Sequence, residues 1–212
     1  MKKHGLLNLE HRVTEAEKRT GAQIVLAVIE RSDAYPELPW KAFALAAAVA
    51  GLLVVLQDVT RPGWTSGVAV LYAVSLTLSA GITSALLCVY VPPFARLFLD
   101  RHRAFSEVHQ YASHLFLSRE MFATRRRTGI LLLLSLFERR VVALPDTGLA
   151  EFLSHDALQT IIGRMTAALK KGQIERALED GLASLEDALA GKAIGGSGEN
   201  KLPDTVIEEK GE

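Results

Sequence analysis

Two stretches, residues 42–56 (AFALAAAVAGLLVVL) and residues 67–91 (GVAVLYAVSLTLSAGITSALLCVYV), decide how this chain is organised. The first is apolar at every position, and the second carries no charged residue. Because the core of a bilayer takes about 20 helical residues, the second stretch can span it, and the first can when its helix begins near Leu38. The turn-rich link 57–66 makes the two helices antiparallel, which predicts a transmembrane hairpin over residues 39–92. A buried hairpin in a soluble protein is the alternative, and the length of the uncharged second stretch disfavours it.

A hairpin returns the chain to the side of the membrane that it left. Residues 1–39 and 93–212 must then share one compartment. Basic residues near the helix ends lie mostly on this shared side, where Arg31, Lys41, Arg96, Arg101 and Arg103 stand against Arg61 in the link. Positive charge favours the cytoplasmic side, so we expect an integral protein of the inner (cytoplasmic) membrane with both termini and the globular domain in the cytoplasm.

Composition limits the partners of the remaining chain. Of 212 residues with a formal net charge of zero, about 50 are used by the hairpin, which leaves enough for one domain. Residues 93–140 contain nine arginines against four acidic residues. A basic region directly after a transmembrane helix favours anionic lipid headgroups, and nothing in the sequence is typical of a nucleic-acid-binding module. The predicted partners are the lipid bilayer and a membrane protein, with no nucleic acid.

The part before the hairpin holds one helix and one strand. Apolar residues at helical spacing from Leu6 to Ala16 predict a helix, with Asn8 as its N-cap and Gly21 as its end. Residues 23–29 (QIVLAVI) are typical of a strand that is buried on both faces. A single strand cannot bury itself, so its partners must follow the hairpin. The hairpin is therefore predicted to be an insertion into a domain made of residues 1–30 and 93–190.

The part after the hairpin supplies the rest of the sheet. Residues 128–144 (TGILLLLSLFERRVVAL) predict two antiparallel strands with a polar break at residues 138–140, and the first should pair with residues 24–29. Helices should cover both faces of this sheet. They are predicted at about 104–123, from a Ser154 cap to Gly172, and at 174–189, and the tail 191–212 is predicted to be acidic and disordered.

These motifs resemble the TPM domain family. The similar pieces are RTGA at residues 19–22, TGIL at 128–131, ERRV at 138–141 and ALKKGQIERALEDGL at 168–182. The family includes thylakoid photosystem-repair proteins, once described as acid-phosphatase-like, and bacterial membrane homologues that carry a similar hairpin. The resemblance implies a three-layer α/β/α sandwich around a small mixed sheet, with an inserted two-helix transmembrane hairpin.

The resemblance also implies candidate site residues. Some members bind Ca²⁺ or another divalent ion through aspartates at strand ends, and weak phosphatase activity has been attributed to plant relatives. Asp146 matches the family's Asp-x-Gly pattern and is the candidate metal ligand, although capping of its own loop is the favoured role. The aspartate typical of the family before the strand at Gly129 is replaced here by Arg125, Arg126 and Arg127, which would repel a cation. These arginines are candidates for binding a lipid or another anion, or for a solvated helix end.

A non-catalytic function follows best from this pattern. Metal-dependent hydrolysis needs several converging ligands or a nucleophile with a positioned acid and base, and neither is evident in the sequence. We expect no cofactor, with Ca²⁺ or Mg²⁺ as the weaker option. The prediction is a membrane-anchored accessory, binding or quality-control factor for a membrane complex; the alternative is a divalent-metal-dependent phosphatase with weak activity.

Overall fold

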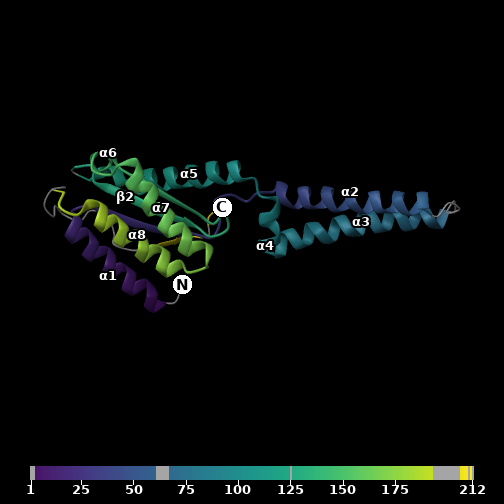
Figure 1. Cartoon of the computed structure of the whole chain (residues 1–212), viewed down its shortest axis with the longest axis horizontal. Helices are drawn as coiled ribbons and strands as arrows, with labels where there is room; N and C mark the ends of the chain where they lie inside the picture. The colour runs from purple at the N-terminus through teal and green to yellow at the C-terminus, as the bar shows by residue number, and fades with distance from the viewer. Residues whose placement is uncertain (1–2, 61–66, 125, 193–205, 210, 212) are drawn as a thin grey trace. The chain divides into compact units, whose positions relative to one another are not determined.

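The chain forms two compact units, a globular unit and a hairpin unit. The computed structural model describes residues 3–60, 67–124, 126–192, 206–209 and 211. Residues 1–33 and 104–212 belong to the globular unit, and residues 34–103 form the hairpin unit (Figure 1). The hairpin unit therefore interrupts the globular unit in sequence.

A four-stranded mixed sheet lies at the centre of the globular unit. Its strands are β1 (Gln23–Ile29), β2 (Gly129–Ser135), β3 (Arg140–Pro145) and β4 (Ile207–Glu209), in the order β3-β2-β1-β4. β1 and β2 are parallel, with Ile24 opposite Ile130, and β2 and β3 are antiparallel. The predicted pairing of the first strand with a strand that follows the helical hairpin is confirmed. The predicted antiparallel pair of strands within residues 128–144 is confirmed as well.

Helices cover both faces of the sheet. They are α1 (Lys3–Thr20), α5 (Arg101–Ser118), α7 (His155–Lys170) and α8 (Ile174–Leu189). Alternate residues of the strands point to opposite faces. Leu26 and Leu132 pack with α1, α7 and α8, while Ala27 and Leu133 pack with α5. Every residue of β2 is buried, so the three-layer α/β/α sandwich predicted from the sequence is confirmed.

Helix ends follow local capping chemistry. Ser154 accepts a hydrogen bond from the backbone N–H of Ala157 at the start of α7, as predicted, and the chain leaves α7 through Gly172, with φ +75°. The prediction for Asn8 is wrong, because α1 already begins at Lys3 and Asn8 lies inside it. The helix predicted to begin at Ala104 begins at Arg101 and ends at Ser118, and a short 3₁₀ turn, η2 (Met121–Ala123), follows.

Asp100 explains why α5 begins earlier than predicted. Its carboxylate accepts hydrogen bonds from the backbone N–H groups of His102 and Arg103, each at 2.9 Å. The hydrogen bond from Arg103 is the largest cause that holds the pKa of Asp100 below its ordinary value. The carboxylate thus satisfies two of the N–H groups that a helix leaves unpaired at its first turn.

The C-terminal tail differs from the prediction. Residues 191–212 were expected to be disordered, but β4 pairs in parallel with β1, with Ala27 opposite Ile207. Val206 is 9% exposed, and Ile207 packs against the cluster below α5. The strand could not be predicted from the composition of the tail, which has few apolar residues to bury. It forms because its backbone can hydrogen-bond to the open edge of β1. Residues 193–205 of the tail lie outside the described residues.

Two long apolar helices form the hairpin unit. They are α2 (Glu37–Thr60) and α3 (Gly67–Tyr90), and they pack side by side (Figure 1). By length and composition, each could cross a membrane. Residues 61–66, most of the predicted link, lie outside the described residues. A turn, α4 (Pro92–Ala95) and η1 (Arg96–Phe98), follows α3.

Small side chains form the contact between the two long helices. Ala42 and Ala50 of α2 and Gly81 and Ser84 of α3 are buried there. Gly81 makes room for an aromatic ring, because a Cβ atom at this position would lie 2.6 Å from Cε2 of Phe43. Most of the larger Leu, Val and Ile side chains of both helices are exposed.

Candidate functional site

Asp146, the predicted metal candidate, is a buried carboxylate at the end of β3. It is the N-cap of α6 (Thr147–Ala150), and its side chain is 2% exposed. Oδ1 accepts a hydrogen bond from the backbone N–H of Thr147 at 2.7 Å. Oδ2 accepts one from Nε of Arg127 at 2.8 Å. Both oxygens are therefore engaged within the protein.

Arg127 reaches Asp146 from an unusual backbone position. Its φ is +57°, in the left-handed region that residues other than Gly, Asn and Asp rarely adopt. The arginine side chain is 50% exposed, and its guanidinium carbon lies 6.0 Å from the centre of the Phe122 ring. The hydrogen bond to Asp146 raises the pKa of Arg127 above its ordinary value. The guanidinium therefore remains charged at any physiological pH.

At Gly148, the loop that follows β3 meets the loop that precedes β2. A Cβ atom at this position would lie 2.0 Å from the carbonyl oxygen of Arg126 and 2.9 Å from that of Arg127. No side chain fits in so little space. Close packing of the 126–127 backbone against the loop after β3 gives the glycine of the Asp-x-Gly pattern its physical role.

The structure thus brings together two candidates that the sequence treats separately. Arg127 forms an ion pair with Asp146, and Arg126 is exposed beside it. Arg125 lies outside the described residues. Binding of a lipid or another anion by these arginines stays a prediction. The predicted hairpin of strands places the two residues at the same edge of the sheet, but the sequence does not indicate the ion pair, because the pair depends on the left-handed backbone of Arg127.

The donor set around Asp146 does not fit the divalent ion that the family resemblance implies. A hard cation such as Ca²⁺ takes six to eight oxygen ligands. Among the described residues, no three His, Cys, Asp or Glu side chains gather closely enough to hold a metal ion. The one carboxylate at the loop is already bound to a guanidinium and to a backbone N–H.

A second buried carboxylate, Glu138, lies at the opposite end of the parallel strands, in the turn between β2 and β3. It is 9% exposed and accepts hydrogen bonds from the backbone N–H of Ser32 at 3.0 Å and from its hydroxyl at 2.7 Å. The hydroxyl of Ser135 donates to the other oxygen. Ser32 lies three residues after the end of β1, where the chain leaves the sheet. Glu138 therefore fastens this exit to the turn, a role that the sequence analysis missed because it read residues 138–140 as a polar break.

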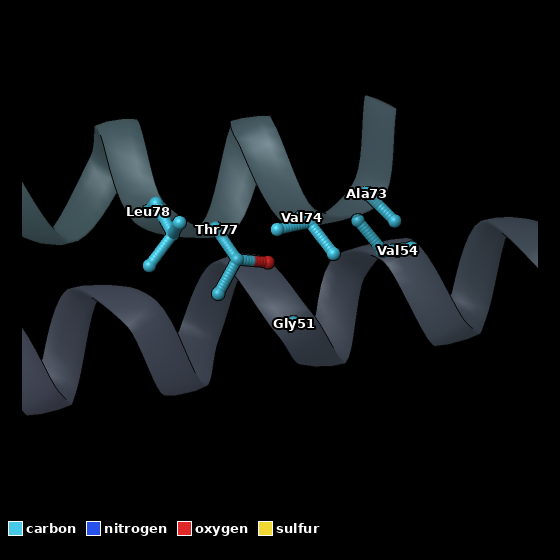
Figure 2. Close-up of a pocket in the computed structure, with 6 residues that line it drawn as sticks. All are labelled: Gly51, Val54, Ala73, Val74, Thr77 and Leu78. Atoms are coloured by element: carbon cyan, nitrogen blue, oxygen red, sulfur yellow. The ribbon is translucent and has the colours of Figure 1, made fainter. Parts of the chain in front are cut away.

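The hairpin unit carries a shallow apolar groove between α2 and α3. Its lining residues are Gly51, Val54, Ala73, Val74, Thr77 and Leu78 (Figure 2). Nothing lies within 4 Å of the position that a Cβ of Gly51 would take. The Thr77 hydroxyl is the polar side-chain group of this lining, and none of the other lining residues is an acid or base that could activate it for catalysis.

Exposed apolar side chains of the globular unit gather on one segment. Among its described residues, the large hydrophobic side chains that remain exposed are Phe105 (55%) and Leu117 (61%) of α5 and Phe122 (38%) of η2. α5 and the following turn η2 cover this face of the sheet, and the three exposed side chains lie on these two elements. This segment is a candidate binding surface.

Comparison with known proteins agrees with this fold. Residues 88–188 match the family model described as the TPM domain, a range that runs from the end of α3 through α8. No curated protein matches the sequence. The chain is similar in structure to the NMR structure of BA42 protein from the psychrophilic bacterium Bizionia argentinensis, with a TM-score of 0.56 and 14% identity. That alignment covers 98% of this chain and 94% of the other. At this identity the likeness shows the fold, and the match to the TPM domain model covers residues 88–188 of this chain.

Proposed function

We propose that this protein is an integral membrane protein that holds its TPM domain on the cytoplasmic side of the inner membrane. There it acts as a non-catalytic accessory, binding or quality-control factor for a membrane complex. The observation that carries the proposal is the surface of the hairpin unit. Most of its large apolar side chains are exposed along both long helices, and exposing such a surface to water is energetically unfavourable. A bilayer around the hairpin covers them.

A binding role is favoured over hydrolysis by the state of the two buried carboxylates. Asp146 is bound to Arg127, and Glu138 is bound to Ser32 and Ser135. A general acid or base must be within hydrogen-bond reach of a substrate atom. Both groups instead hold loops of the protein together, so they act as structural residues.

The partner is expected to bind the outer surface of α5. Leu117 is the most exposed large apolar side chain among the described residues of the globular unit, and α5 begins where the hairpin unit ends in sequence. An exposed apolar patch on a domain tied to the membrane suits a partner that is itself in the membrane.

Site-specific photo-crosslinking in living cells tests this proposal. A benzoylphenylalanine at position 117 is expected to give one or a few discrete adducts with an integral membrane protein. The matched control is position 170, an exposed lysine on α7 across the sheet, and it should give none. Identical adducts from both positions, or no adduct from position 117, would contradict a partner surface on α5.

A further inference from the structure

We propose that the loop around Asp146 is a cation-binding loop whose cation belongs to the protein itself. The guanidinium of Arg127 occupies the position of a bound ion, and an acidic residue at position 127 would convert the loop into a site for Ca²⁺. This inference does not rest on the proposed function, because it concerns the charge balance of one loop.

Burial of the Asp146 carboxylate makes a nearby cation necessary. Removing an ionised carboxylate from water costs several kcal/mol unless a cation and hydrogen-bond donors compensate it. The Asp146 side chain is 2% exposed, and the N–H of Thr147 fixes one of its oxygens. It cannot turn towards solvent without giving up the cap of α6. The loop therefore requires a positive charge close to Oδ2, and Arg127 supplies it at 2.8 Å.

A tight backbone turn positions the positive charge of Arg127. The N–H of Arg127 donates to the carbonyl of Thr124 at 3.0 Å, and the N–H of Thr128 donates to the Thr124 hydroxyl at 3.0 Å. These bonds close a tight turn that holds Arg127 at φ +57°. A left-handed conformation costs a residue of this type roughly 1–2 kcal/mol. The turn accepts this strain and places the guanidinium on the carboxylate.

The loop also contains backbone carbonyl oxygens. The carbonyl oxygens of Arg126 and Arg127 lie against Gly148, two residues from Asp146, so backbone oxygens line the same crossing. Calcium prefers carboxylate and carbonyl oxygens, with water completing the shell. An aspartate adopts the left-handed region more readily than arginine does. Arg127→Asp would therefore change a neutral pair into two carboxylates in a loop that also contains these two carbonyl oxygens, without opposing the turn.

The test uses the full chain in detergent and four proteins. They are the wild type, Arg127→Asp, Arg127→Asp with Asp146→Asn, and the matched control Arg126→Asp, which makes the same charge change at the exposed neighbour. Melting temperature is measured in chelator and in 10 mM CaCl₂, with NaCl at equal ionic strength as the ion control. Arg127→Asp should melt below the wild type in chelator and rise by several degrees with Ca²⁺, while the other three shift by less than about 1 °C.

A second variant keeps the proposal testable if Arg127→Asp fails to fold. Arg127→Gly accepts the left-handed backbone at no cost and removes the cation. It should melt several degrees below the wild type, and ethylguanidinium at about 20 mM should restore part of the loss where NaCl does not. Three results would each overturn the inference. They are a rise of several degrees in the wild type with Ca²⁺, a folded Arg127→Asp that ignores Ca²⁺, and an Arg127→Gly as stable as the wild type.

Discussion

Replacing Glu138 with alanine is expected to lower the free energy of unfolding of the globular unit by about 3 kcal/mol. The carboxylate accepts three hydrogen bonds in a buried setting, two of them from Ser32. Hydrogen bonds to a charged group contribute about 1.5–3 kcal/mol each, and a buried N–H left without a partner costs about 1–3 kcal/mol. The two serine hydroxyls can rotate towards other acceptors, which keeps the loss below the sum.

Amide hydrogen exchange of β1 and β2 in the full chain measures this effect. Both tryptophans, Trp40 and Trp64, belong to the hairpin unit, so their fluorescence does not report on the sheet. The control is Glu30→Ala, an exposed glutamate at the end of β1, which should change stability by less than about 0.5 kcal/mol. Equal effects of the two substitutions would show that Glu138 does not fasten the chain exit to the turn.

Replacing Gly148 with alanine is expected to cost about 3 kcal/mol or more. The new methyl group would meet the carbonyl oxygen of Arg126 at 2.0 Å. A flexible side chain could move aside, but here the whole 126–127 backbone must shift, and this also pulls Arg127 away from Asp146. The expected result is a lower melting temperature together with faster exchange in α6 and at the end of β3.

A second glycine provides the matched control for this substitution. Gly163 lies on the exposed face of α7, and nothing lies within 4 Å of the position of its Cβ. Gly163→Ala should therefore stabilise the protein by about 0.5–1 kcal/mol, because alanine favours a helix interior. If Gly148→Ala is as well tolerated as Gly163→Ala, the close crossing of the two loops at Gly148 is wrong.

The sandwich could be predicted from the sequence because its signals are local and strong. Residues 23–29 and 129–135 are apolar at nearly every position, which only a strand covered on both faces explains. The cap at Ser154 and the end at Gly172 have side-chain and backbone requirements that few residues meet. Ile24 and Ile130 then pair because both strands must be buried in the same core.

The candidate site could not be predicted in the same way. The hairpin of β2 and β3 brings the strand ends beside Arg127 and Asp146 together, but the ion pair depends on a left-handed turn that the triple arginine does not encode. The bonds of Glu138 to Ser32 span 106 residues, across the whole inserted hairpin. β4 forms because β1 offers an open edge, a property of the assembled sheet that the composition of the tail does not contain.

In the proposed topology the hairpin spans the membrane and leaves the globular unit in the cytoplasm. The most direct test of this topology is cysteine labelling of intact cells in a Cys88→Ser background, where no native thiol remains. Thr60→Cys, exposed at the end of α2, should react with a membrane-impermeant maleimide. Gln110→Cys, exposed on α5, should react only after the cells are lysed. Reaction of both in intact cells, or of Gln110→Cys alone, would contradict the account.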